Sequence, residues 1–270
     1  MGLPKWVIQG FLFSWIVGCL PAGASPPSAP EGLRWQITEP LSDGFSGPNL
    51  DRSKWLDTNP KWPGRLPSLF TAGNVSVRGG FLHLTTTTFQ QDSRGSQPAF
   101  WIAAATIRSR DQSAFYGYYE ARLRASDLAT TSSFWLKGTF SEIDITEAVG
   151  ASNKRHEMAN RMHASSHYLS NGGKIDQVTT AMIPTLSSVT DWHTYGVWWK
   201  DARTLWFYLD NKIVSEQTTK GDFTEPMFLY FDTEAVEDTD GLPDEQALRD
   251  PHRNAMLVDW VRSYKLVPAH

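Results

Sequence analysis

The chain has 270 residues, of which 40% are hydrophobic and 13% aromatic, and its formal net charge at pH 7 is −4. This length and apolar content are enough for one large core, and single-domain β-sandwiches commonly reach this size. Binding to nucleic acid needs a basic patch that neutralises phosphates, so the acidic balance argues against a nucleic-acid partner. We expect one globular domain that acts as a monomer.

The first 24 residues are typical of a signal peptide. Lys5 is their only charged residue, residues 6–20 form an apolar run, and residues 22–24 read Ala-Gly-Ala, a signal-peptidase site. The apolar run is too short to span a membrane. The sequence before Cys19 is also similar to a bacterial lipobox, in which the cysteine becomes a lipidated first residue. We favour cleavage after Ala24 and a secreted or periplasmic protein, with a lipid anchor at Cys19 as the alternative.

Residues 25–32 read Ser-Pro-Pro-Ser-Ala-Pro-Glu-Gly and are predicted to be a linker before a catalytic domain at 33–270. From there, short strand-like segments alternate with turn residues. The predicted strands are 74–77, 81–85, 103–109, 117–124, 158–168, 194–200, 204–209, 227–232 and 255–266, and we expect 103–109 to pair with 117–124 around Tyr116. Only Asp244–Asp250 is expected to be helical. So many strands predict an all-β sandwich.

The most informative stretch is residues 141–147, Ser-Glu-Ile-Asp-Ile-Thr-Glu. On a regular strand, Glu142 and Asp144 share one face and Glu147 points to the other. A single β-bulge between Asp144 and Glu147 would restore the alternation and place all three carboxylates on one face. Their mutual repulsion costs stability and raises at least one pKa, unless their proximity serves a purpose.

Glycoside hydrolysis with retention of configuration would be such a purpose. That reaction needs an ionised nucleophile and a protonated acid whose carboxyl groups lie roughly 5–5.5 Å apart. Glu142 and Glu147 are candidates for the pair, and Asp144 between them can hydrogen-bond to a neighbour and separate their two pKa values. A solvated acidic strand is the alternative. An apolar strand that contains Trp135 leads into the acids by one short turn, which favours the enzymatic interpretation.

These residues resemble glycoside hydrolase family 16 in its bulged E-x-D-x-x-E form. The motifs that carry the resemblance are Tyr116-Gly-Tyr-Tyr-Glu-Ala-Arg122, Glu142-Ile-Asp-Ile-Thr-Glu147, His193-Thr-Tyr-Gly-Val-Trp198 and Val258-Asp-Trp-Val-Arg262. The resemblance covers roughly residues 35–266. It implies a concanavalin-like jelly roll with a concave substrate cleft, and no cofactor for catalysis. It also implies that Glu142 is the nucleophile, Glu147 the acid/base and Asp144 their hydrogen-bonding partner.

Several other side chains are candidates for substrate binding. Trp62 and Arg65 lie in a long loop, where they either line the cleft, as the agarase and porphyranase members imply, or tether the loop to the core. Trp135 is expected in the cleft if its face matches that of the acids. His163 and His167 share one face of a strand and are either cleft-facing or simply hydrogen-bonded histidines. Glu234, at the end of an apolar strand, is expected to reach the cleft.

A pair of histidines on one strand, four residues apart, lies about 13 Å apart and is too distant to share one metal ion. The family resemblance suggests a structural calcium instead. Asp259 matches a position that binds calcium in several members, with backbone carbonyls such as that of Gly80 as further ligands.

The sequence therefore predicts a retaining, endo-acting glycoside hydrolase that cleaves β-linkages in a polysaccharide. Glucan-cleaving members typically have Trp-Pro and Gly before the first glutamate and Met before the second. Here Lys137-Gly-Thr-Phe-Ser141 leads into the motif and Thr146 occupies the Met position. That difference favours an agar-type galactan, agarose or porphyran. An endo-β-1,3-glucanase and a non-catalytic polysaccharide-binding lectin are the alternatives.

Overall fold

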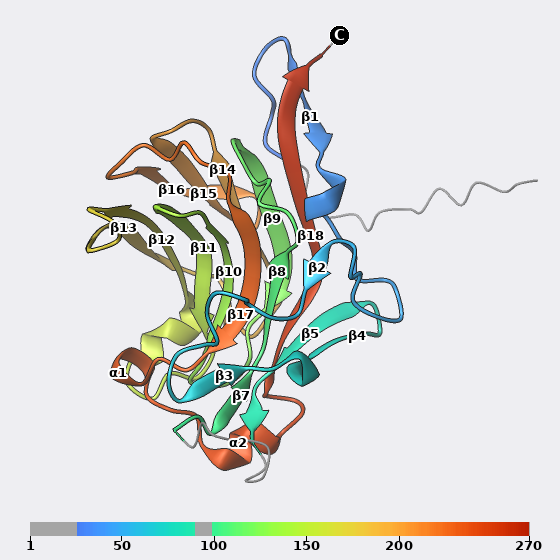
Figure 1. Cartoon of the computed structure of the whole chain (residues 1–270), viewed down its shortest axis with the longest axis vertical. Coiled ribbons are helices and arrows are strands. Elements are labelled where there is room, and N and C mark those ends of the chain that lie inside the picture. Colours follow the sequence, from blue (N-terminus) through green and yellow to red (C-terminus); the bar gives the residue numbers. More distant parts are fainter. Residues whose placement is uncertain (1–25, 90–98, 270) are drawn as a thin grey trace, which may run out of the picture.

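The computed structural model describes residues 26–89 and 99–269. The predicted signal peptide and Cys19 lie outside the described residues. Two large antiparallel sheets pack face to face (Figure 1), and we call them the front sheet and the back sheet. They form the β-sandwich that the strand pattern predicts.

The front sheet contains, in spatial order, β13 (Ile175–Pro184), β12 (Arg161–Ser170), β11 (Ser141–Val149), β10 (Thr131–Lys137), β17 (Phe228–Glu234), β8 (Thr106–Ser109) and β2 (Trp55–Leu56). The back sheet contains β16 (Lys212–Thr218), β15 (Thr204–Leu209), β14 (His193–Trp199), β9 (Gly117–Arg124), β18 (Ala255–Pro268), β5 (Phe81–Thr85) and β4 (Val75–Arg78). At one end of the molecule, β1 (Leu33–Ile37) pairs with the end of β18 and the two extend beyond the sandwich (Figure 1).

A small sheet and short helices close the opposite end. The small sheet consists of β3 (Ser68–Phe70), β7 (Ile102–Ala104) and β6 (Thr87–Thr88), and the helices are α1 (Glu237–Asp240) and α2 (Glu245–Arg249). Single 3₁₀ turns occupy Glu39–Leu41, Ala72–Asn74 and His156–Asn160. The predicted helix is confirmed as α2, which Asp244 caps by accepting a hydrogen bond from the Ala247 amide at 2.8 Å. Within the described ranges, no helix has the length and apolarity to cross a membrane.

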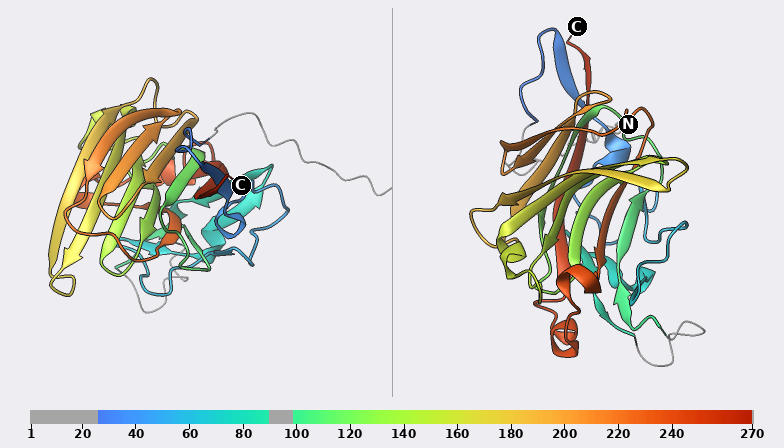
Figure 2. Two further views of the ribbon diagram at one scale, coloured as in Figure 1. Left: turned by 90° about the horizontal axis from the view of Figure 1, so that it is seen from above. Right: turned by 90° about the vertical axis from the view of Figure 1, so that its left-hand side faces the viewer.

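The core lies between the two sheets, which Figure 2 shows as separate layers. On β11, Ile143 and Ile145 are fully buried in this core, so Asp144 between them points away from it. Next to them, Phe134 of β10 stacks on Phe231 of β17 with ring centroids 4.7 Å apart. This packing fixes the inner face of the front sheet, and the outer face of the same strands is left for a site.

The expected pairing of residues 103–109 with 117–124 is wrong. The second part of the first segment, β8, pairs with β17 and β2 in the front sheet, whereas β9 pairs with β14 and β18 in the back sheet. The connection between β8 and β9 passes from one sheet to the other, and Ala114 within it bridges to Met227. The alternation of residues along a strand predicts which side chains share a face. The strand with which a segment pairs depends instead on strands far away in the sequence.

Two other features show where local signals are sufficient and where they are not. The predicted turn at Asp210 and Asn211 is confirmed, and both residues adopt positive φ angles of 48° and 65°, as a two-residue hairpin requires. Strand β13 was not predicted. It is an edge strand whose residues are mostly exposed on both faces, so its sequence has no clear apolar alternation.

Candidate active site

The bulge predicted in β11 is present, and it brings the three acids onto one face. Across β10 and β11, Glu142 is opposite Lys137, Asp144 is opposite Trp135 and Glu147 is opposite Ser133, while Ile145 has no partner. The extra residue lies between Asp144 and Glu147, as expected. All three carboxylates consequently line the same hollow on the outer face of the front sheet.

Each acid has a basic or imidazole partner on a neighbouring strand. Lys137 of β10 forms an ion pair with Glu142. On the other side, Nε2 of His167 lies 3.1 Å from Asp144 Oδ2, and Nδ1 of His163 lies 3.1 Å from Glu147 Oε2. These partners offset the repulsion that three carboxylates on one strand would otherwise create.

Asp144 lies in a network of hydrogen bonds. The Ser165 hydroxyl donates to Asp144 Oδ2 at 2.5 Å, and Nδ1 of His167 lies 2.8 Å from Asp176 Oδ2 of β13. Burial alone would lower the pKa of His167, but the hydrogen bonds to Asp144 and Asp176 and the charges of Asp144 and Glu142 outweigh it and raise that pKa to about 10. His167 is therefore an imidazolium between two carboxylates at neutral pH.

The pKa of Glu142 results from opposing effects. Burial and the nearby charge of Asp144 raise its pKa, whereas the ion pair with Lys137 and the charge of His167 lower it, and the result is a pKa of about 6. Above that pH the Glu142 carboxylate is mostly ionised, the state that a nucleophile requires.

A cavity of about 500 Å³ opens beside Glu142, and a smaller hollow of about 80 Å³ adjoins it over Asp144 and Glu147. Trp135 lines both, so it lies on the face of the acids. Its ring stacks on Tyr230 at 4.4 Å, and its Nε1 donates to Asp232 Oδ2 at 2.9 Å. The cavity therefore has an aromatic wall whose orientation is fixed before any ligand binds.

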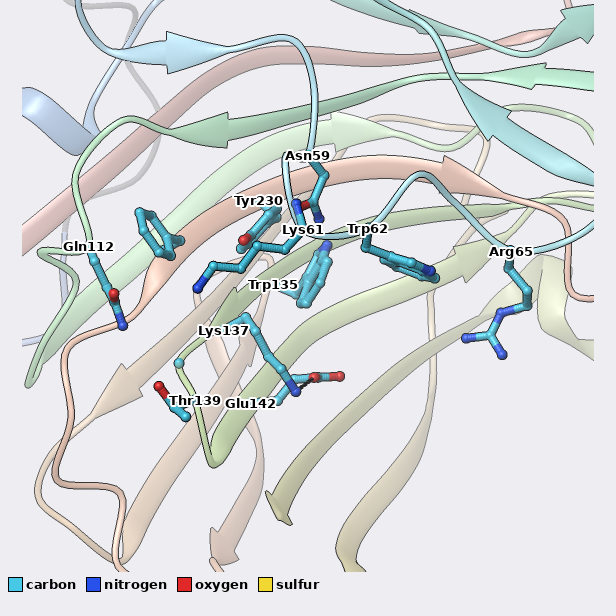
Figure 3. Close-up of a pocket in the computed structure, with 12 residues that line it drawn as sticks. Asn59, Lys61, Trp62, Arg65, Gln112, Trp135, Lys137, Thr139, Glu142 and Tyr230 are labelled. Carbon is cyan, nitrogen blue, oxygen red and sulfur yellow. Dashed lines mark hydrogen bonds and ion pairs between the residues drawn. The ribbon is translucent and has the colours of Figure 1, made fainter. Parts of the chain in front are cut away.

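The loop that carries Trp62 and Arg65 covers this cavity (Figure 3). Nε of Arg65 donates to Glu234 Oε2 at 3.2 Å, and its guanidinium lies 5.8 Å from the centre of the Trp62 ring. Trp62 in turn meets Phe70 edge to face at 5.7 Å. The two side chains thus line the cleft and tether the loop at the same time, so both interpretations of the sequence apply.

The family model of the β-porphyranase A–D GH16 domain matches residues 35–266, which is most of the chain. This protein belongs to glycoside hydrolase family 16. Among the similar curated proteins are β-porphyranase B of Phocaeicola plebeius, 34% identical over 90% of this chain and 88% of its own, and β-porphyranase E of Zobellia galactanivorans, 34% identical over 88% and 91%. The family 16 members found in these comparisons are glycosidases, and this chain is a glycosidase too.

The solved structures agree with this assignment. The crystal structure of a β-porphyranase from the human gut bacterium Bacteroides plebeius is 31% identical, has a TM-score of 0.81 and covers 90% of this chain and 96% of its own. Porphyranase B of Zobellia galactanivorans is 28% identical with the same TM-score of 0.81, and covers 92% and 98%. β-Agarase A of that organism, at 22% identity and a TM-score of 0.81, shows the shared fold. The sandwich of this glycosidase is therefore the family's jelly roll.

Two further residues, Lys137 and Asp232, shape the site of this glycosidase. Lys137 lies at the end of β10, and its role depends on the cross-strand register with Glu142. Asp232 is buried on β17, where burial and the charge of Glu234 raise its pKa well above the usual range. The alternation Asp232-Thr-Glu234 does place both acids on one face, so this signal was present in the sequence.

Asp259, the candidate calcium ligand, lies beside an arginine. Its Oδ2 lies 2.6 Å from Arg122 Nη1, so the carboxylate already has a cationic partner. Calcium requires six to eight oxygen ligands. Within the described residues, Asp259 belongs to no group of three acidic or histidine ligands. The structural calcium stays a prediction without support from these contacts.

Three side chains at the acid motif have the spacing of metal ligands. One ligand atom each of Glu142, Asp144 and His167 lies within 4.8 Å of the others. The Lys137 ion pair and the hydrogen bonds between His167 and two aspartates already account for this cluster.

The opposing effects on Glu142 give a direct test. Its carboxyl carbon, followed by carbon-13 NMR against pH, should titrate with a midpoint near 6. Lys137→Met removes the main cation that lowers this pKa and should move the midpoint to higher pH. The matched control Lys174→Met, on the β12–β13 turn, should leave it in place. A midpoint that does not rise in Lys137→Met would contradict the ion pair.

Proposed function

We propose that this glycosidase cleaves β-linkages inside agar-type galactan chains, porphyran or agarose, with retention of configuration. The observation that carries the proposal is the set of three acids on one face of β11, beneath a cleft with aromatic and basic side chains. The printed names of the relatives, β-porphyranases and β-agarases, support the substrate class.

The mechanism assigns one role to each acid. A carboxylate oxygen of Glu142 attacks the anomeric carbon while Glu147 gives its proton to the leaving oxygen, which breaks the glycosidic bond and forms a glycosyl-enzyme. Glu147 then takes a proton from water, and the hydroxide attacks the same carbon and releases Glu142. Asp144, which contacts His167 and accepts a hydrogen bond from Ser165, fixes the position of the neighbouring acids.

The basic side chains in the cleft favour a galactan that carries sulfate esters. Lys61, Arg65 and Lys137 all line the larger cavity, together with Asn59 and Gln112. Lysine and arginine bind sulfate through charge-assisted hydrogen bonds, and aromatic rings contact the apolar faces of sugars. Porphyran is such a sulfated galactan. Glu234 lines the smaller hollow, and His163 and His167 contact Glu147 and Asp144, so we expect these three side chains beside the bound chain.

The two alternatives explain less of the site. An endo-β-1,3-glucanase has no need of this group of cations around the cleft. A lectin needs the aromatic wall but not three acids, each with its own basic or imidazole partner. We therefore place the galactanase ahead of both.

A panel of porphyran, agarose, carrageenan, laminarin and mixed-linkage glucan, assayed by the release of reducing ends, tests the substrate. Porphyran or agarose should be cut into even-numbered oligosaccharides. Trp62→Ala and Arg65→Ala should mainly raise KM, because both side chains bind the chain and do not react. Faster hydrolysis of laminarin by a wide margin would refute the galactan assignment, although the mechanism would stand.

The roles of the two glutamates are tested by chemical rescue. Glu142→Ala should lose turnover with the fold intact. Glu147→Ala should also be nearly inactive on polysaccharide but still form the intermediate from an aryl glycoside with a good leaving group, which needs no acid. Azide should then rescue Glu147→Ala and yield a β-glycosyl azide. A β-azide from Glu142→Ala, or an α-azide from Glu147→Ala, would reverse the roles, because the α-azide forms only where the nucleophile is missing. An inverted product from the native enzyme would exclude retention.

We also propose that the enzyme is exported and that the mature chain begins at Ser25. The support is the leader of residues 1–24, with one charge, an apolar run and an Ala-Gly-Ala site. The mass of the exported protein is the measurement. A chain that begins at a lipid-modified Cys19 would overturn the proposal and place the enzyme on a membrane surface.

A further inference from the structure

The two histidines of β12 occupy equivalent positions but have different partners. His167 lies between two carboxylates, with Nε2 3.1 Å from Asp144 Oδ2 and Nδ1 2.8 Å from Asp176 Oδ2. Ionised carboxylates only accept hydrogen bonds, so both ring nitrogens must carry a proton to make both bonds. His167 is thereby fixed as a cation.

His163 has a carboxylate on one side only. Its Nδ1 lies 3.1 Å from Glu147 Oε2, and its Nε2 lies 2.8 Å from the hydroxyl Oγ1 of Thr180. A hydroxyl both donates and accepts, so the ring keeps both bonds while neutral, whichever nitrogen carries the proton. His163 therefore orients Glu147 without fixing its charge.

Strand β13 creates this difference. In the pairing of β12 with β13, His167 is opposite Val178 and His163 is opposite Met182. Each histidine forms its hydrogen bond with the β13 residue two positions before the one opposite it. Those residues are Asp176 and Thr180, on one face of the edge strand. The same geometry, used twice, presents a carboxylate to one histidine and a hydroxyl to the other.

We propose that His163 is a positioning residue for Glu147, and that the Thr180 hydroxyl, unlike a carboxylate, lets its ring keep both bonds without a fixed charge, so that Glu147 can exchange its proton during turnover. The inference rests on the proposed function, since it takes Glu147 as the acid/base. A retaining enzyme needs this group protonated in its first step and ionised in its second. A permanent cation at His163 would favour the ionised state and slow the first step.

Other charged groups also surround Glu147. Asp144 and Glu142 share its strand, Asp232 and Glu234 face it from β17, and Arg65 pairs with Glu234. None of these groups is changed in the variants below, so their effect is the same in each.

The decisive variant is Thr180→Asp, which gives His163 the surroundings that His167 already has. Thr180 is exposed on an edge strand, so the fold should tolerate the change. His163 should become a cation, and the alkaline limb of the kcat/KM profile on porphyran should move to lower pH by roughly one unit. Thr180→Asn, similar in size but uncharged, should move the limb far less. Gln177→Glu, a new charge on the other face of β13, should leave the limb in place.

The direction of the shift separates this inference from a plain charge effect. A new carboxylate that acts only through its charge holds the proton on a nearby acid and moves the alkaline limb to higher pH. A rise, or no movement, in Thr180→Asp would overturn the inference. In a His163→Gln background the same substitution should raise the limb, and a fall there would overturn it as well. Failure of the native enzyme to cleave any galactan would refute the proposed function instead.

Discussion

The site depends on holding three carboxylates together on one face of β11. The bulge at Ile145 makes this possible, because it restores the alternation that would otherwise send Glu147 to the opposite face. Like charges at this spacing repel, and they are tolerated because β10 supplies Lys137 and β12 supplies two histidines. The acid site is thus formed by three adjacent strands, and the short motif in the sequence covers only the central strand, β11.

The core keeps these acids in place. The strand that carries them buries Ile143 and Ile145 on its other face, and the adjoining strands stack Phe134 on Phe231 directly beneath the cleft. Protein interiors are close-packed, so a shift of β11 along its axis would disturb this packing. The cost would be similar to that of losing a core side chain, on the order of several kcal/mol. The sandwich therefore supplies the precision that general acid and nucleophilic catalysis need.

Local features of this chain are predictable from sequence, and long-range ones are not. The bulge, the face of the acids and the turn at Asp210 follow from residue alternation and backbone preference over a few positions. The pairing of β8 with β17, by contrast, depends on which distant strands complete each sheet. Strand β13 has little apolar pattern because, as an edge strand, it buries little surface. Its contributions to the site, Asp176 and Thr180, were missed with it.

The charges in the cleft are not evenly distributed, and this matters for two chemically identical glutamates. Lys137 lies against Glu142, with Lys61 lining the same cavity, whereas Asp232 and Glu234 lie on the side of Glu147. A cation nearby favours loss of a proton from a carboxyl group, and further carboxylates favour its retention. Lys137 and His167 thus limit the rise in the pKa of Glu142 that burial and Asp144 cause, so that this carboxyl is ionised above about pH 6, as a nucleophile must be. A retaining reaction requires the two glutamates to begin in opposite protonation states.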